Sequence, residues 1–196
     1  MNLKYTMADG TEMIVNLALV DSGDQTDLVY DFCTDNSDWA LPCKGASKPM
    51  QSHYRISKVN KPDSRAYGMD LVMVDGGKYK DMIASRMRRS NGEGSWMVYK
   101  DCDLEYAEQV TSEHKINVRA GNGKKRLAWV PKRTHADNHY LDAEVYAYVA
   151  ADIRGVRSLH LEEYEEHEIS KEVPEPDNEY SPEESWIAAN ENWLKE

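Results

Sequence analysis

The clearest hydrophobic pattern in the chain runs from Asn138 to Arg154 and predicts an amphipathic helix. Apolar residues recur there at the three- and four-residue spacing of a single helix face, namely at Leu141, Val145, Val149 and Ile153. Asp137 is a candidate N-cap, and Gly155 is a candidate stop behind the last helical residue. We therefore expect a helix that packs its apolar face against the core of the domain.

Asp142 interrupts the apolar face of this helix, between Val145 and Val149. A carboxylate at such a position is costly to bury unless it is paired or holds a metal ion. His139 precedes Asp142 by three residues, a spacing at which two helix side chains meet. Two interpretations stay open: a functional carboxylate, or a partly exposed Asp bonded to a neighbouring loop.

Two shorter apolar runs predict buried strands, and each is followed by an aspartate. Met13–Val20 leads to Asp21, and Met69–Val74 leads to Asp75. The carboxyl ends of such strands are where open α/β sheets bind ligands. We expect Met13–Val20 to be the central strand and Met69–Val74 its neighbour, with the helix from Asn138 lying across them. The alternative for Asp21 is an ordinary turn residue, because its surroundings are also good turn chemistry.

The rest of the pattern predicts further elements of one mixed α/β body. They are a hairpin at Ala8-Asp9-Gly10, a helix capped by Asp24 or a strand at Thr26–Cys33, strands at Trp39–Lys44, Tyr54–Val59 and Trp96–Tyr99, helices at Lys78–Arg89 and from Asp103 to Val110, and a hairpin of His114–Arg119 with Arg126–Val130. The fold class is therefore α/β, with a mixed central sheet flanked by helices.

Charge divides the chain into two parts. The 196 residues hold 24 Lys and Arg against 35 Asp and Glu, but 13 of the acids and only 2 of the bases lie in residues 161–196. Residues 1–160 are electrically balanced, so they form the expected compact domain, and 161–196 form an acidic tail. Within the tail, Ser181-Pro182-Glu183-Glu184 has the signature of a helix start. The apolar residues behind it recur on one face and predict a short amphipathic helix, which we expect to dock on a partner protein rather than on the body: Trp186, Ile187, Trp193 and Leu194.

The cysteine pattern and the hydropathy favour a cytosolic protein without a membrane partner. Cys33, Cys43 and Cys102 are an odd number without CxxC spacing, as expected of reduced thiols. No apolar run approaches the ~18 residues that a membrane helix needs, and no signal peptide opens the sequence.

The three aspartates predict a metal site if the two strands and the helix meet at one edge of the sheet. Clustered acids such as Asp21, Asp75 and Asp142 repel one another unless divalent cations neutralise them. Oxygen ligands with little Cys or His select Mg²⁺ or Mn²⁺. Two such ions, about 4 Å apart, would support phosphodiester hydrolysis.

Four segments in this order resemble the nuclease domain of the large terminase subunit of tailed bacteriophages. They are VDSGDQTDLVYDFC, LVMVDGGKYKDMI, QVTSEH and NHYLDAEVYAYVAAD, and the resemblance covers roughly residues 5–157. It implies an RNase H-like fold and an endonuclease that cuts double-stranded viral DNA during genome packaging in the host cytoplasm. It also implies that Asp21, Asp75 and Asp142 bind the metal ions, with His139 beside them; Asp75 departs from the Glu frequent at that position.

The resemblance further implies partners. The ATPase half of a large terminase is missing from this sequence, so we expect an isolated domain that works with the ATPase domain of the same large subunit. A portal or small terminase protein is the other expected partner. A junction resolvase, an RNA–DNA hybrid ribonuclease and a non-catalytic acidic interaction module remain the alternatives.

Basic residues offer a candidate DNA track. The tip of the second hairpin and the approach to the late helix supply five of them: Lys124, Lys125, Arg126, Lys132 and Arg133. Lys78, which follows Asp75 closely, is a sixth. Charged hairpin tips are common in any protein, and a solvated helix lysine is the simpler interpretation of Lys78. For Glu113 we expect a salt bridge rather than a catalytic role.

Overall fold

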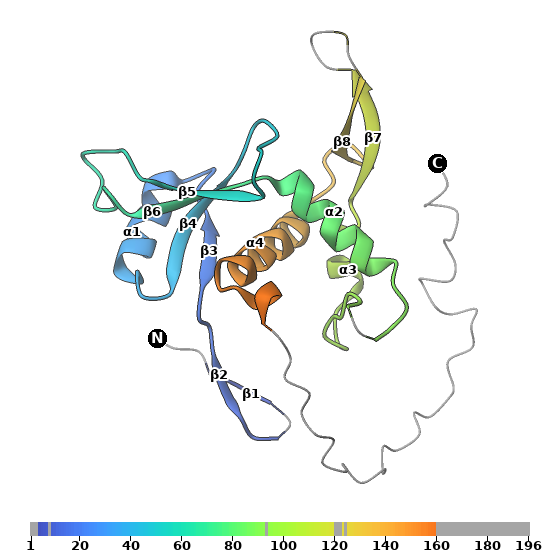
Figure 1. Ribbon diagram of the computed structural model, residues 1–196, viewed down its shortest axis with the longest axis horizontal. Helices are drawn as coiled ribbons and strands as arrows, with labels where there is room; N and C mark the ends of the chain where they lie inside the picture. Colours follow the sequence, from blue (N-terminus) through green and yellow to red (C-terminus); the bar gives the residue numbers. More distant parts are fainter. Residues whose placement is uncertain (1–3, 8, 93, 120–122, 124, 160–196) are drawn as a thin grey trace. The chain divides into compact units, whose positions relative to one another are not determined.

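The computed structural model describes residues 4–7, 9–92, 94–119, 123 and 125–159 (Figure 1). The expected acidic tail with its amphipathic helix, and Lys124 in the basic hairpin tip, lie outside the described residues. No helix within the described ranges is long and apolar enough to cross a membrane.

A four-stranded mixed sheet forms the centre of the domain. Its strands, in spatial order, are β3 (Ala18–Asp21), β4 (Ala40–Gly45), β6 (Asp70–Val74) and β5 (Tyr54–Lys58). The pairs β3–β4 and β4–β6 are parallel, and β5 runs antiparallel to β6. The predicted fold class, a mixed sheet flanked by helices, is confirmed.

The prediction that Met13–Val20 forms one central strand is wrong. β2 (Glu12–Ile14) pairs only with β1 (Lys4–Thr6) in a hairpin of its own, and β3 begins again at Ala18. Among the described strands, β3 lies at an edge of the sheet, and β4 separates it from β6. The reason is that α1 (Thr26–Asp35) connects β3 to a parallel strand, and such a unit places consecutive strands side by side.

Helices cover both faces of the sheet. On one face, α2 (Gly76–Met87) and α4 (His139–Ile153) pack on the strands. The core between them consists of Cys43, Val72, Val74, Tyr79, Ile83, Val145 and Val149. The predicted apolar face of the late helix is confirmed, since Leu141, Val145 and Val149 are all buried. A smaller cluster contains Tyr30 of α1 with Val59 and Ala66.

The remaining elements follow the sequence pattern with a few exceptions. α3 (Leu104–Val110) is capped by Asp103, and β7 (Glu113–Arg119) forms an antiparallel hairpin with β8 (Lys125–Pro131), as predicted. The prediction of a strand at Trp96–Tyr99 is wrong, because this segment is irregular. The predicted caps of two helices are also wrong, since α1 begins behind Gln25 and α4 behind Asn138, and neither makes a side-chain capping bond.

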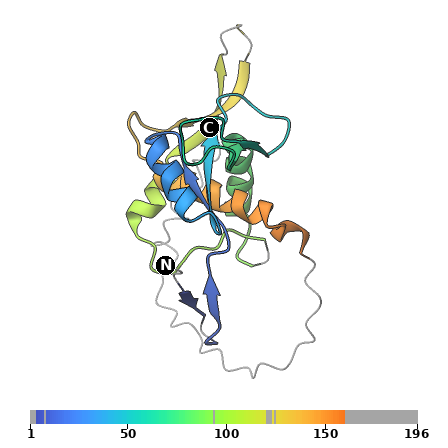
Figure 2. The ribbon, with the colours of Figure 1, turned by 90° about the vertical axis from the view of Figure 1, so that its left-hand side faces the viewer.

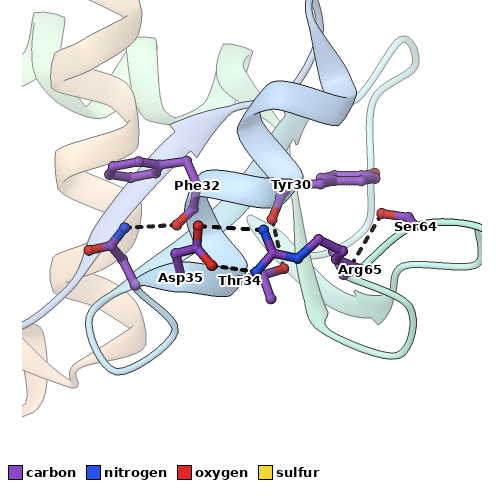
Figure 3. Close-up of polar contacts among 8 residues, drawn as sticks. Tyr30, Phe32, Thr34, Asp35, Ser64 and Arg65 are labelled. Carbon is purple, nitrogen blue, oxygen red and sulfur yellow. Dashed lines mark hydrogen bonds and ion pairs between the residues drawn. The ribbon is translucent and has the colours of Figure 1, made fainter.

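The far end of α1 is tied to the loop before β6 (Figure 3). Asp35 forms a two-oxygen ion pair with Arg65, with its shorter contact at 2.5 Å. Thr34 donates to the carbonyl of Tyr30 in the preceding turn, and the loop is held by a bond from the amide of Ala66 to Ser64. These contacts hold α1 and the loop before β6 together on the face of the sheet opposite α4.

The end of α4 is closed as predicted. Gly155 has a φ of 74°, the left-handed conformation that suits glycine behind a helix. Asp152, near this end, accepts a hydrogen bond of 2.8 Å from the buried Tyr79 hydroxyl and pairs with Arg157. The contact links α4 to α2 and to the short 3₁₀ helix Val156–Ser158.

All three cysteines are free, as the spacing predicted. Burial raises the pKa of the Cys33 thiol to about 11, and it raises that of Cys43 as well.

The core between α2 and the sheet gives the first prediction. Ile83→Ala should lower the free energy of unfolding by about 3 kcal/mol, because it removes buried atoms and leaves a cavity. Ile56→Ala on the exposed side of β5 is the matched control and should change it by less than about 1 kcal/mol. Urea unfolding followed by circular dichroism measures both, and equal losses would contradict the assigned core.

Candidate functional site

A cavity of about 500 Å³ lies between β3 and α4. Its strand wall is the continuous segment 17–21, and its helix wall consists of His139, Asp142, Ala143, Tyr146, Ala147 and Ala150. Figure 1 shows β3 running beside α4. The two elements therefore bring Asp21 and Asp142 to one cavity, although 120 positions separate them in the chain.

Asp21 enters the cavity from the carboxyl end of β3. Its register partner across the parallel pair is Cys43, a core residue on the α4 side, so the Asp21 side chain points to the same face. Its Oδ1 accepts a hydrogen bond of 2.8 Å from the amide of Gly23. The remaining carboxylate surface is exposed and available to a ligand.

Tyr146 contacts Asp21 from the opposite wall. Burial raises the pKa of the Tyr146 hydroxyl, and the carboxylates of Asp21 and Asp142 together with a hydrogen bond to Asp21 raise it further. The hydroxyl therefore stays protonated near neutral pH and acts as a donor toward Asp21.

Asp142 is held on two sides in the first turn of α4. Its Oδ1 lies 3.1 Å from the Lys80 Nζ, and its Oδ2 accepts a hydrogen bond of 3.0 Å from the Asn138 side-chain amide. Both contacts fix the rotamer of a half-buried carboxylate. The pairing that the apolar position of Asp142 demanded is thus supplied by Lys80.

Glu113 completes a four-residue cluster with these groups. Its Oε1 accepts from Lys80 Nζ and from the Asn138 amide, each at 2.8 Å. The Lys80 and Glu113 side chains are only 12% and 7% exposed, so the ion pair is nearly buried. The cluster joins α2, β7 and α4, and the expectation of a salt bridge for Glu113 is confirmed.

His139 lines the cavity, but it does not form the pairing expected from its spacing to Asp142. Its side chain is 82% exposed, and its Nε2 lies 3.8 Å from an oxygen of Asp137. An exposed imidazole at the rim is free to contact a ligand that enters from solvent.

Asp75 does not line this cavity. It caps α2, where one oxygen accepts from the amide of Lys78 at 3.3 Å and the other from the amide of Met50 at 2.9 Å. The physical reason is the strand order: β4 lies between β3 and β6, so the two strands are roughly 10 Å apart. The register adds to this distance, because Val72 is level with Asp21 and Asp75 lies three residues beyond it. Two of the three predicted carboxylates are brought together, and Asp75 is not.

Lys78 and the other predicted basic residues have different surroundings. The Lys78 ammonium donates to three carbonyls, of Met50, Gln51 and Ser52, and so fixes that loop. Lys125 and Arg126 lie exposed on β8, in the hairpin that projects from the body (Figure 2).

Two further basic residues follow β8 on the way to α4. Lys132 and Arg133 are exposed there, and local desolvation lowers the pKa of Lys132. With Lys125 and Arg126 they leave a basic stretch that runs from the hairpin toward the start of α4.

The chemical type of the available ligands suits a hard divalent cation. Asp21 and Asp142 offer carboxylate oxygens, the ligands that Mg²⁺ and Mn²⁺ prefer. Within the described part of the chain, however, no three His, Cys, Asp or Glu side chains form a group that could hold a metal ion. The cavity supplies two carboxylates rather than the expected three.

Three residues around the site escaped the sequence analysis: Lys80, Asn138 and Tyr146. One signal could have found the last two. Asn138, Asp142 and Tyr146 follow one another at four-residue intervals, so they share one helix face. No pattern in the sequence around Lys80 predicts its role, because its partners come from distant segments.

Comparison with known families gives one finding. A family model described as terminase large subunit gpA, endonuclease domain, matches residues 1–163. Comparisons with curated proteins and with solved structures gave no match.

The Lys80 cluster gives the second prediction. Lys80→Met should lower the free energy of unfolding by about 3 kcal/mol, because it leaves the Glu113 carboxylate buried without its cation. Adding Glu113→Gln to this variant should restore part of the loss, so a double-mutant cycle in urea should show strong coupling.

The exposed pair Lys4–Glu12 serves as the matched control. Lys4→Met should change the stability by less than about 1 kcal/mol, because water already solvates both groups. Equal losses in the free energy of unfolding for the Lys80 and Lys4 variants would contradict the buried ion pair between Lys80 and Glu113.

Proposed function

We propose that this chain, which belongs to the family of terminase large subunit gpA endonuclease domains, cuts double-stranded DNA while a phage genome is packaged. The family supports a nuclease role in phage DNA packaging and implies a DNA substrate and a larger packaging complex. The reaction proposed is hydrolysis of a phosphodiester bond assisted by two Mg²⁺ or Mn²⁺ ions.

One observation carries the proposal: Asp21 and Asp142 line the same cavity from a strand end and a helix start. The other contacts keep these carboxylates in place. Tyr146 donates toward Asp21, while Lys80 and Asn138 hold the two oxygens of Asp142. When bound at the two carboxylates, Mg²⁺ or Mn²⁺ supplies an activated water and charge neutralisation at the phosphate.

His139 has a place in this arrangement at the cavity rim. Its exposure lets it reach a phosphate oxygen of the DNA backbone. Glu113 and Lys80 act as positioning residues, since they touch Asp142 or its partners rather than the reacting atoms.

The DNA path proposed here follows the basic residues from the hairpin to α4. Lys125, Arg126, Lys132 and Arg133 would contact phosphates, with Lys124 as an expected addition outside the described residues. Lys78 has a weaker claim, because three carbonyl groups already occupy its ammonium.

The partners proposed are those that a packaging nuclease needs. They are the ATPase domain of the same large subunit and a portal or small terminase protein, all acting in the host cytoplasm. The acidic segment 161–196, whose helix prediction remains untested, is the proposed contact for one of them.

The third prediction tests the chemistry. The chain should nick and linearise supercoiled plasmid DNA in Mn²⁺ or Mg²⁺, and EDTA should stop it. Asp21→Asn and Asp142→Asn should each lower the rate by at least about 100-fold, because each removes a charged metal ligand. Agarose gel assays with purified protein give the rates, and unfolding curves show whether each variant is folded.

Asp75→Asn is the matched control for these substitutions. Asn also caps helices well, so this variant should keep its fold and most of its activity. If Asp75→Asn abolishes cutting while Asp142→Asn does not, the site lies at the end of β6 and the cavity is misassigned. If the enzyme prefers a four-way junction or an RNA–DNA hybrid to plain duplex, the substrate is misassigned.

The fourth prediction concerns DNA binding. Changing both Lys125 and Arg126 to Ala should weaken duplex binding and lower the slope of log affinity against log salt by about 0.9 for each lost phosphate contact. Fluorescence anisotropy over a series of salt concentrations measures the slope. Lys78→Ala is the control: the salt slope should stay constant, and only stability should fall.

A further inference from the structure

One segment is basic, although the chain as a whole is acidic. Residues 39–62 contain five Lys and Arg and no Asp or Glu, whereas the 196 residues together carry a net charge of −11. Two of these cations are paired with acids, Lys58 with Asp70 at 2.6 Å and Lys61 with Asp27. The other three form no ion pair or hydrogen bond with any part of the chain that the structure describes: Lys44, Lys48 and Arg55. Their charges are therefore available to an anionic partner.

Two of the three unpaired cations line a second cavity, of about 480 Å³, beyond the carboxyl end of β4. Lys48 and Arg55 are both exposed in it. Ser47, Gln51 and Ser52 add hydroxyl and amide donors to the lining. Among the described residues, those that line this cavity include no acid. An anion bound there would meet positive charge and hydrogen-bond donors.

The sheet places these cations on the face opposite α4. Lys44 of β4 and Arg55 of β5 are both level with Met73 of β6, which lies between them. The residues before and after Met73 belong to the core on the α4 side, so Met73 and its two level neighbours point to the other face. Lys44 and Arg55 thus lie in one row across the sheet, and Lys48 follows in the loop behind β4.

Contacts from the start of α2 hold this loop in place. Asp75 accepts a hydrogen bond of 2.9 Å from the amide of Met50, and the Lys78 ammonium donates to the carbonyls of residues 50–52 at 2.7 to 3.3 Å. Neither Asp75 nor Lys78 lines the cavity. The negative ends of three peptide groups are therefore directed to Lys78, and the loop is ordered before any ligand binds. A ligand that binds to an ordered loop loses less affinity to the cost of ordering it.

We propose that this second cavity binds phosphate groups of a duplex DNA backbone, through Lys48 and Arg55 with Lys44 beside them. The proposal rests on the proposed nuclease function and adds a DNA contact apart from the hairpin of β7 and β8. The guanidinium of Arg55 can donate to two phosphate oxygens at once, and the Lys48 ammonium supplies a point charge.

The position of the cavity argues for a DNA backbone rather than for a free nucleotide. β3 ends at Asp21 at the same, carboxyl end of the parallel strands, and three strand spacings, roughly 14 Å, separate β3 from β5. This distance equals about four nucleotides along one strand of a duplex, so a single DNA strand can pass both places. The described lining also offers no aromatic ring on which a free base could stack.

Two double variants of the full chain test the proposal. Lys48→Gln with Arg55→Gln removes the two cations of the cavity. Lys58→Gln with Lys61→Gln is the matched control, because it removes the same charge from the same segment but takes it from paired residues. Fluorescence anisotropy with a short labelled duplex in EDTA, over a series of salt concentrations, measures binding without cutting.

The cavity variant should bind the duplex at least about tenfold more weakly at low salt. Its slope of log affinity against log salt should fall by about 1.8, because two phosphate contacts are lost. The control variant should keep its slope and lose less than about twofold in affinity. Lys48→Arg with Arg55→Lys keeps both charges and should keep the slope. Urea unfolding should show all three variants folded, because the substituted side chains are exposed.

Hydrogen exchange of the unchanged chain locates the contact. The duplex should protect amides of residues 47–52, which form the loop of the cavity. Inorganic phosphate and ATP, each at the phosphate concentration of the duplex, should protect them far less, because neither presents a row of phosphates. Poly-glutamate tests an acidic peptide as the occupant and should also fail.

The proposal is overturned if the unchanged chain does not bind the duplex, or if the cavity and control variants lose the same affinity. It is also overturned if phosphate, ATP or poly-glutamate protects the loop as well as the duplex does. Failure of the nuclease function looks different: the cavity variant loses affinity for DNA as expected, yet the unchanged chain leaves plasmid DNA uncut in Mn²⁺ or Mg²⁺.

Discussion

The packing of α4 onto the sheet is the interaction on which the site depends. Val145 and Val149 are buried in one cluster with the strand residues Cys43, Val72 and Val74, and this burial sets the rotation of the helix about its axis. Once the rotation is set, Asp142 and Tyr146 face the edge of β3, where Asp21 lies. A site made of a strand end and a distant helix therefore needs no loop to assemble it.

The same packing creates an electrostatic problem, which Lys80 solves. A carboxylate beside an apolar helix face is costly without a counter-charge, and Glu113 adds a second negative group close by. The Lys80 ammonium pairs with both, and Asn138 donates to both, so all four side chains are satisfied. One cation from α2 thus holds α4 and β7 together and fixes the geometry of Asp142.

Much of the fold could be predicted from local pattern. The face of α4, the cap at Asp103 and the hairpin of β7 and β8 all follow from residue spacing, and the structure has each of them. The strand order could not be predicted, because an apolar run indicates burial without naming its neighbour. α4 covers β3 at the sheet edge, so a strand that looked central lies beside a groove.

The site was predictable to the extent that its residues interrupt a pattern. Asp142 stood out on an apolar face and Asp21 at a strand end, and the structure places them on one cavity. Asp75 showed the same local signal, yet its strand lies one position too far away. Lys80 gave no signal, because its role depends on contacts with two segments distant in sequence.

The central claim is that Asp21 and Asp142 bind a catalytic cation in the cavity between β3 and α4. Anomalous diffraction from crystals grown with Mn²⁺ tests it most directly. The account predicts an anomalous peak bonded to carboxylate oxygens of both residues, and its loss in the Asp142→Asn protein. A peak at Asp75 with none between β3 and α4 would contradict the account.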